Sequence, residues 1–180
     1  DAAVALSGLN TIWSLNLPLA ELSDLAAELG SDVPLFLGPP AARLTGRGEV
    51  VAPLEVGRFA VILLMSGLIC STAEVYGAYD RLGPSDDLNQ IDTQILTAEP
   101  PSAWRDKLRN DLAPAAMSVC PELSLLRERL VAQSNQPVHI TGSGSTMFIL
   151  CDNAEDAAEV VSGLDSDLQN MCTIATRNPW

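Results

Sequence analysis

The amino-acid sequence predicts an α+β protein whose larger part, from Phe59 onward, is a ferredoxin-like α/β sandwich. The patterns in this part run strand, helical region, strand, strand, helix, strand, which is the ferredoxin-like order. Hydrophobic residues make up 47% of the 180 positions, enough for a substantial core. A break from Pro53 to Gly57 predicts a boundary between domains 1–56 and 57–180. The fold hosts many functions, so it indicates none by itself.

The first domain is predicted to contain two helices and a hairpin. Asp1 can cap a helix whose apolar surface comes from Val4, Leu6, Leu9, Ile12 and Trp13. Pro18 suits the first turn of a second helix, which Gly30 ends; its apolar face is formed by Leu19, Leu22, Leu25 and Leu29. Ala41 to Leu44 and Glu49 to Leu54 are predicted strands joined by a glycine-rich turn.

The second domain opens with a continuous apolar run, Arg58 to Met65, that predicts a buried strand. Ser71 and Glu74 form a capping box at the start of the next helix. A polar surface loop with a short helix is expected from Pro84 to Pro101. The later elements are a helix opened by Pro121, strands at 138–140 and 146–150, a helix capped by Asn153 and a strand at 171–176.

Charge and composition exclude several classes of partner. The net charge of −13 and only ten Lys and Arg residues argue against nucleic acid and against an anionic membrane surface. No transmembrane run is visible. The four cysteines are far apart and there is one histidine, His139, so no metal site is expected. Thiols in apolar stretches are ordinarily buried and reduced, which predicts a cytoplasmic protein.

Two short stretches are candidates for function. In Leu29-Gly30-Ser31-Asp32-Val33-Pro34 the aspartate can cap a short turn, which is the commonest use of such a residue. In Thr141-Gly142-Ser143-Gly144-Ser145-Thr146 a small polar turn joins two strands, and most such turns are only hairpins.

Taken together, these stretches resemble the GHMP small-molecule kinases. Asp1-Ala2-Ala3 resembles the end of the family's glycine-rich phosphate loop, and Asn110-Asp111-Leu112-Ala113-Pro114 resembles an N-D-L-E-P motif, with Ala113 in place of glutamate. The Asp32 stretch narrows the resemblance to the branch that phosphorylates 4-diphosphocytidyl-2-C-methyl-D-erythritol in the non-mevalonate isoprenoid pathway. The resemblance implies that Asp32 is the catalytic base. It also implies ATP phosphate contacts by Asp1, Gly142, Ser143 and Gly144, and substrate contacts by Thr72 and Ser143.

The resemblance carries further expectations about the whole protein. Residues 1–56 would be the end of an N-terminal domain like domain 2 of ribosomal protein S5, and 57–180 the C-terminal domain. The phosphate loop and a catalytic lysine would lie upstream of Asp1, so the fragment alone should be inactive. ATP and Mg²⁺ are implied, with no Mg²⁺ ligand assignable, and the partners would be ATP and a cytidine diphosphate-linked sugar alcohol, in a monomer or homodimer. The alternatives are another GHMP kinase or a non-catalytic ferredoxin-like binding module.

Overall fold

The computed structural model describes residues 1–39, 41–48, 50–83 and 99–177. The chain is α+β, with helices and antiparallel sheets, and it divides into two compact units. Unit 1 is Asp1–Val56 and unit 2 is Gly57–Trp180.

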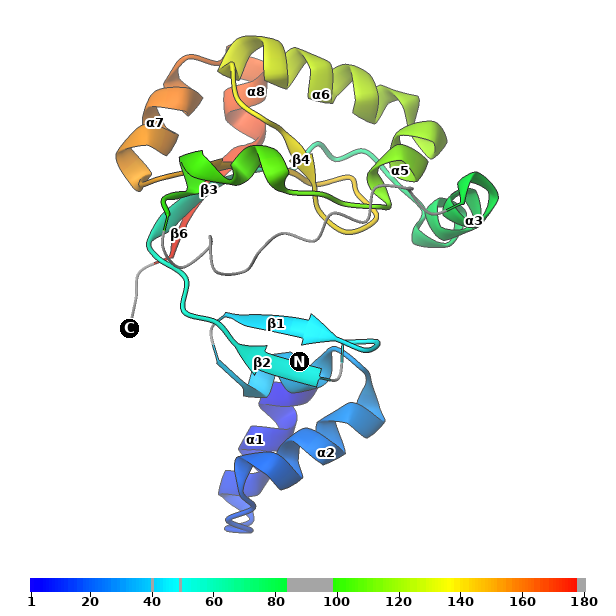
Figure 1. Ribbon diagram of the computed structural model, residues 1–180, viewed down its shortest axis with the longest axis vertical. Helices are drawn as coiled ribbons and strands as arrows, with labels where there is room; N and C mark the ends of the chain where they lie inside the picture. The colour runs from blue at the N-terminus through cyan, green and yellow to red at the C-terminus, as the bar shows by residue number, and fades with distance from the viewer. Residues whose placement is uncertain (40, 49, 84–98, 178–180) are drawn as a thin grey trace. The chain divides into compact units, whose positions relative to one another are not determined.

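Unit 1 joins two helices and a short 3₁₀ helix to a two-stranded antiparallel hairpin (Figure 1). The 3₁₀ helix packs against both α-helices. The predicted helix end at Gly30 is confirmed, because Gly30 is the C-cap of α2. Position 49, the predicted start of the second strand, lies outside the described residues. The elements are α1 (Ala2–Ile12), α2 (Leu19–Leu29), η1 (Val33–Leu37), β1 (Ala42–Thr45) and β2 (Val50–Pro53).

Unit 1 buries fewer apolar side chains than the sequence pattern predicts. Leu19, Leu25 and Leu29 are 55%, 41% and 62% exposed, whereas Leu22 and Ala26 are the buried residues of α2. A hairpin and a single 3₁₀ turn are too small to cover both faces of a helix pair, as expected for a unit of this length. The leucine-rich face of α2 is therefore only partly buried within this unit.

Unit 2 is built on a four-stranded antiparallel sheet with the order β4-β5-β3-β6. Its strands are β3 (Phe59–Leu64), β4 (His139–Ile140), β5 (Met147–Cys151) and β6 (Cys172–Arg177). The two central strands come from far apart in the sequence, and β3 pairs with β5 on one side and β6 on the other. This is the sheet of the ferredoxin-like sandwich that the sequence predicts.

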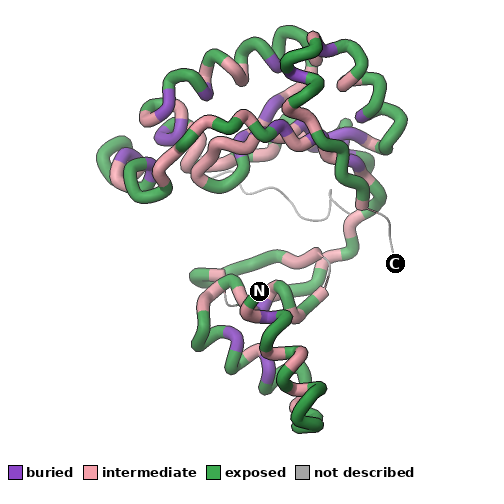
Figure 2. Tube along the Cα trace, turned by 180° about the vertical axis from the view of Figure 1, so that it is seen from behind, coloured by how far each residue is buried: buried purple, intermediate pink, exposed green. Residues whose placement is uncertain are grey.

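The core of unit 2 lies between this sheet and the helices on one side of it (Figures 1 and 2). Every second residue of β3, namely Ala60, Ile62 and Leu64, is buried. The register sets these residues opposite Cys151, Ile149 and Met147 of β5, so one face of the central strand pair is apolar. The helices of unit 2 are α3 (Thr72–Leu82), α5 (Ala113–Val119), α6 (Pro121–Ser134), α7 (Ala154–Ser162) and α8 (Ser166–Met171).

Predicted caps define the starts of two of these helices. The Ser71 side chain accepts a hydrogen bond from the Glu74 N–H at 3.4 Å, and Asn153 accepts one from the Asp156 N–H at 2.9 Å. The short helix α8 was not predicted, because six residues carry too little periodic pattern to reveal it. The predicted 84–101 loop lies mostly outside the described residues. The chain then forms two 3₁₀ helices, η2 (Pro101–Ala103) and η3 (Arg105–Lys107).

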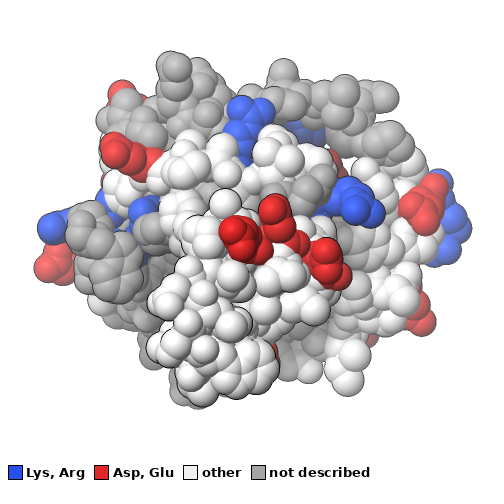
Figure 3. Space-filling view, turned by 90° about the horizontal axis from the view of Figure 1, so that it is seen from below, with Lys and Arg blue, Asp and Glu red and all other residues white. Residues whose placement is uncertain are grey.

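The surface of the protein is more acidic than basic, as the net charge of −13 requires. On the face shown in Figure 3, uncharged side chains cover much of the area, acidic side chains gather near its middle, and Lys and Arg lie apart from one another. Among the described helices, none combines the length and the apolar character needed to cross a membrane.

Candidate functional site

Asp32 stands at the start of η1, as predicted, but its side chain does not cap the turn. It is the N-cap residue of η1, and its carboxylate accepts no capping hydrogen bond. Its backbone angles, φ −91° and ψ −9°, are helical, whereas a capping side chain normally requires an extended N-cap residue. The predicted capping role is therefore wrong. Within the described part of the chain, the exposed carboxylate accepts one hydrogen bond, from the Ser31 hydroxyl at 3.4 Å.

The Asp32 carboxylate lies directly against the backbone of the hairpin turn. A Cβ atom built on Gly48 would be only 2.5 Å from Asp32 Oδ1, far closer than real Cβ contacts. Gly48 also has φ +115°, a conformation that side chains disfavour. No sequence pattern predicts this contact, although the two glycines of Thr45-Gly46-Arg47-Gly48 signal a turn with unusual backbone angles.

Asp1 occupies the N-cap position of α1, and its side chain also makes no capping hydrogen bond. Its carbonyl oxygen accepts the first helical hydrogen bond, from the Ala5 N–H at 2.9 Å. Helix α1 packs against η1, so the two acidic candidates of unit 1 belong to neighbouring elements.

In unit 2, the segment from Thr141 to Thr146 forms a tight turn between β4 and β5, which we call the glycine loop. The Gly144 N–H donates to the Thr141 carbonyl at 3.0 Å, and the Thr141 N–H donates to the Thr146 carbonyl at 3.1 Å. Gly142 and Gly144 both have positive φ, +56° and +85°. The loop is a hairpin turn in its local form, which was the simpler of the two interpretations.

The two glycines of the loop differ in their surroundings. A Cβ on Gly142 would meet no atom within 4 Å, whereas a Cβ on Gly144 would lie 3.3 Å from Leu123 Cδ2 and 3.4 Å from Cys70 Sγ. A side chain at Gly144 would therefore press on Leu123 and Cys70, in addition to the strain of its positive φ. Among the described residues, none obstructs a Cβ at Gly142, so a bound group could approach its backbone there.

Two predicted substrate-binding residues meet at the glycine loop. The hydroxyl oxygens of Thr72 and Ser143 lie 3.0 Å apart, at hydrogen-bonding distance, although the residues are 71 positions apart. Thr72 is the first residue of α3, where the Ser71 cap fixes the direction of the helix. The fold thus brings the start of α3 to the glycine loop, and Thr72 is exposed there.

The Asn110 side chain is hydrogen-bonded to the backbone of the glycine loop, a contact that local sequence patterns do not predict. The Asn110 side-chain amide donates to the carbonyls of Ile140 and Gly142, both at 2.8 Å, while its oxygen accepts the Leu112 N–H at 3.0 Å. The last bond lies in the turn before α5, whose N-cap residue is Leu112, so Asn110 does not cap that helix. On the other side of the loop, the Ser145 hydroxyl donates to the Leu68 carbonyl.

The titratable groups next to the loop are held neutral. Burial, with the neighbouring Cys120 thiol, raises the pKa of Cys70 to about 11, so the sulfur beneath Gly144 stays protonated at neutral pH. Burial and then the charge of Arg127 lower the pKa of His139. His139 lies in β4 with its ring centroid 5.2 Å from that of Phe148, which confirms it as a strand residue.

The described residues contain no group of three or more His, Cys, Asp or Glu side chains suited to a metal ion. The four cysteines are free thiols. The candidate residues fall into two sets, Asp1 and Asp32 in unit 1, and Thr72 with the glycine loop in unit 2.

Comparison with known protein families gives a match to the description "GHMP kinases C terminal" over residues 97–170. Among curated proteins, the chain is 38% identical over 170 residues to 4-diphosphocytidyl-2-C-methyl-D-erythritol kinase of Nocardia farcinica, covering 91% of this chain and 55% of the relative. The kinase of the same name from Thermobifida fusca is 35% identical over 183 residues, covering 99% of this chain and 60% of the relative. The chain thus spans less than two thirds of the length of these relatives.

Solved structures give the same picture for the fold. A crystal structure of 4-(cytidine 5'-diphospho)-2C-methyl-D-erythritol kinase matches with a TM-score of 0.69 and 28% identity, covering 97% of this chain and 62% of that one. Homoserine kinase from Cytophaga hutchinsonii matches with a TM-score of 0.55 at 13% identity, covering 98% of this chain and 62% of that one. The second match shows a shared fold only.

Proposed function

We propose that this chain is part of an ATP-dependent kinase that phosphorylates the 2-hydroxyl of 4-diphosphocytidyl-2-C-methyl-D-erythritol. The proposal starts from the family, because the chain belongs to the GHMP kinases. In this proposal residues 1–56 are the end of the family's N-terminal domain and 57–180 its C-terminal domain. The substrate is taken from the names of relatives that are 35% and 38% identical over nearly the whole chain. The observation that supports the chemistry is that the carboxylate of Asp32 is exposed and makes no capping hydrogen bond to η1.

In this mechanism Asp32 orients the acceptor hydroxyl and takes its proton as the new P–O bond forms. A carboxylate used as a helix cap would have its oxygens occupied by backbone N–H groups. Among the described residues, Asp32 instead accepts a bond only from Ser31, and it keeps acceptor positions for a substrate hydroxyl. The backbone at Gly48 closes one side of the carboxylate and limits where its oxygen can move.

The glycine loop is proposed to hold phosphate oxygens and part of the substrate. Gly142 leaves its backbone accessible, and the hydroxyls of Ser143 and Thr72 can donate to an anionic oxygen as well as to each other. Asn110 fixes the loop before a ligand arrives, so little conformational entropy is lost on binding. Asp1, at the start of α1, is proposed to face the ATP phosphates through the backbone N–H groups that follow it.

Phosphoryl transfer of this kind uses Mg²⁺ to neutralise charge on the phosphates. The described residues offer no cluster of acidic side chains to hold the ion, so we assign it no protein ligand and derive no step through it. Four free thiols agree with a protein of the reducing cytoplasm, where we propose that the reaction takes place.

The test is an assay of ADP release by the complete protein with and without the cytidine diphosphate-linked alcohol. Asp32→Asn should lower kcat by about a hundredfold or more, since a general base contributes that much, while ATP affinity and melting temperature stay close to those of the parent. Asp24→Asn, at an exposed position of α2, is the matched control and should keep full activity.

Each outcome separates the candidate functions. Equal activity of Asp32→Asn and the parent would rule out Asp32 as the base. ADP release that ignores the cytidine-linked alcohol but responds to another alcohol would indicate a different GHMP kinase. No substrate-dependent ADP release at all would favour a binding module.

A further inference from the structure

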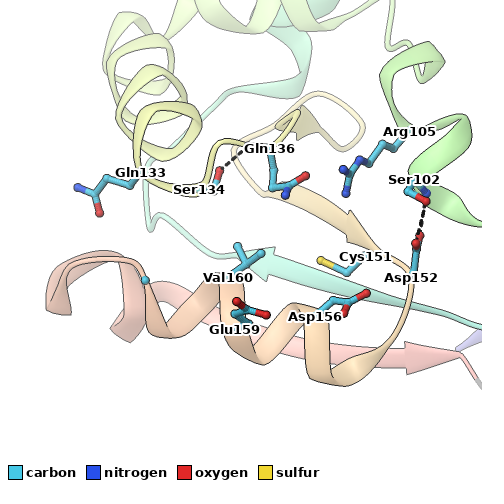
Figure 4. Close-up of a pocket in the computed structure, with 11 residues that line it drawn as sticks. Ser102, Arg105, Gln133, Ser134, Gln136, Cys151, Asp152, Asp156, Glu159 and Val160 are labelled. Carbon is cyan, nitrogen blue, oxygen red and sulfur yellow. Dashed lines mark hydrogen bonds between the residues drawn. The ribbon is translucent and has the colours of Figure 1, made fainter.

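A second pocket, of about 470 Å³, lies in unit 2 away from the glycine loop. Strand β5 begins next to the loop at Met147, and the pocket is at its other end, at Cys151 (Figure 4). The walls come from η2 and η3, the end of α6 with the segment after it, and α7. A volume of this size is within the range of small-molecule sites.

One wall carries an arginine that attracts a carboxylate and an amide oxygen that can accept a hydrogen bond from a ligand. The Arg105 guanidinium extends toward the pocket, and it makes no ion pair or hydrogen bond within the described part of the chain. The Gln136 side chain approaches it from the other side (Figure 4), and its Oε1 is buried without a hydrogen-bond partner among the residues that the structure describes. An unpaired buried acceptor is unfavourable, so a ligand whose N–H group donates to Gln136 Oε1 is favoured.

The opposite wall carries groups that attract cations. Asp156 and Glu159 are three residues apart on α7, so they project from the same face of the helix into the pocket wall. Asp156 accepts a bond from the Asn153 amide at 2.9 Å, whereas Glu159 has no ion pair among the described residues.

A third carboxylate, that of Asp152, is already engaged. It accepts the Ser102 N–H and the Ser102 hydroxyl, both at 2.7 Å, and so fastens η2 to the end of β5. With one arginine and three carboxylates, the lining has a formal net charge of −2.

The floor between the two charged walls is apolar. It includes Val160 and the thiol of Cys151, which is buried. Burial raises the pKa of the Cys151 thiol, while Arg105 lowers it and the nearby Asp156 and Asp152 raise it. The floor therefore stays uncharged at neutral pH and can contact the methylene groups of a ligand.

We propose that this pocket binds a basic α-amino acid, with its carboxylate at Arg105 and its two cationic groups at Asp156 and Glu159. A molecule with one carboxylate and two cations has a net charge of +1, opposite in sign to the lining. Its aliphatic chain would lie over Val160 and Cys151. A simple polyamine would leave Arg105 without a counter-ion, and a dicarboxylate would be repelled by α7.

The test is isothermal titration calorimetry of the complete protein with three probes: L-lysine, putrescine, which lacks the carboxylate, and glutarate, which lacks the cations. Lysine should bind saturably, putrescine at least tenfold more weakly, and glutarate not measurably. Arg105→Gln should weaken lysine binding at least tenfold and leave putrescine unchanged, whereas Glu159→Gln should weaken both.

Matched controls exist on the same elements. Lys107→Gln lies in the same 3₁₀ turn as Arg105, and Glu155→Gln lies on α7, and neither residue lines the pocket. Both should bind lysine like the parent, with all variants checked for parental circular dichroism and melting temperature. If Glu159→Gln does not fold, Asp156→Asn replaces it.

Two results would overturn the proposal. One is the absence of saturable lysine binding up to about 10 mM. The other is an affinity for lysine that stays at the parental value in Arg105→Gln and in Glu159→Gln (or Asp156→Asn), as it should in the two controls. The readout is binding alone, so failure here leaves the kinase proposal untouched.

Discussion

The contact between Gly48 and Asp32 makes Gly48→Ala the sharpest test of the proposed base. The new Cβ would be 2.5 Å from Asp32 Oδ1, about 0.9 Å inside the 3.4 Å at which ordinary contact begins. The aspartate side chain is short and exposed, so it can swing away at small cost in stability. The carboxylate would then be displaced by nearly 1 Å.

The two consequences of this displacement differ in size. Alanine at φ +115° should cost about 1–2 kcal/mol of folding free energy from backbone strain. A displacement of about 1 Å in a catalytic group can lower the rate about a hundredfold. We therefore expect kcat of the complete kinase to fall about a hundredfold, with only a modest fall in melting temperature.

The control is Gly83→Ala, at φ +78°, where the new Cβ would meet no atom of the described residues within 4 Å. It should show similar strain in a melting curve and near-parental kcat in the ADP-release assay. Combining Gly48→Ala with Asp32→Asn should add no further loss, because the displaced group is already inactive. If Gly48→Ala kept parental kcat at the same loss of stability as Gly83→Ala, the reasoning would be refuted.

Three further predictions concern unit 2. Gly142→Ala should raise the KM for ATP or the alcohol at least tenfold and lower the melting temperature only by the backbone strain of its positive φ. Gly144→Ala should lower the melting temperature further, because its Cβ would also press on Leu123 and Cys70; the opposite ranking would argue against ligand approach at Gly142. Asn110→Ala removes the bonds to the loop carbonyls and should lower kcat/KM at least tenfold, and Asn110→Asp, which lacks the donor, should not restore it in the same assay. Asp165 has its pKa lowered to about 2 by hydrogen bonds from Gln133, Arg129 and the Leu168 N–H. Its stabilising effect is thus present above about pH 4 and lost toward pH 2, so the melting temperatures of the parent and Asp165→Asn should differ at pH 7 and converge at pH 2.

The sequence was sufficient for features that depend on local patterns. Short stretches were enough to predict the strand at β3, the Ser71 and Asn153 caps, and the succession of strands and helices along the chain of unit 2. Each is determined by residues within a few positions of one another, where periodicity and capping rules apply.

Features that depend on tertiary contacts were missed or predicted wrongly. The leucine spacing in α2 correctly indicated a helix. It does not determine how much of the helix surface is covered by the rest of the unit, and Leu25 and Leu29 are in fact exposed. The Asp32 position at the start of η1 was predictable, yet the helical angles of Asp32 remove the cap that its residue type suggests. The hydrogen bonds of the Asn110 side chain reach residues that are 30 and 32 positions further along the chain, and no local rule could pair residues so far apart.

The glycine loop shows most directly why a motif alone cannot assign roles. Gly142 and Gly144 are two positions apart, both with positive φ, and in the sequence they are equivalent. Only the packing of Leu123 and Cys70 beside Gly144 distinguishes the two positions. A substitution at Gly144 would press on these side chains whether or not a ligand binds. Evidence for phosphate binding must therefore come from Gly142, where loss of binding can be separated from loss of packing.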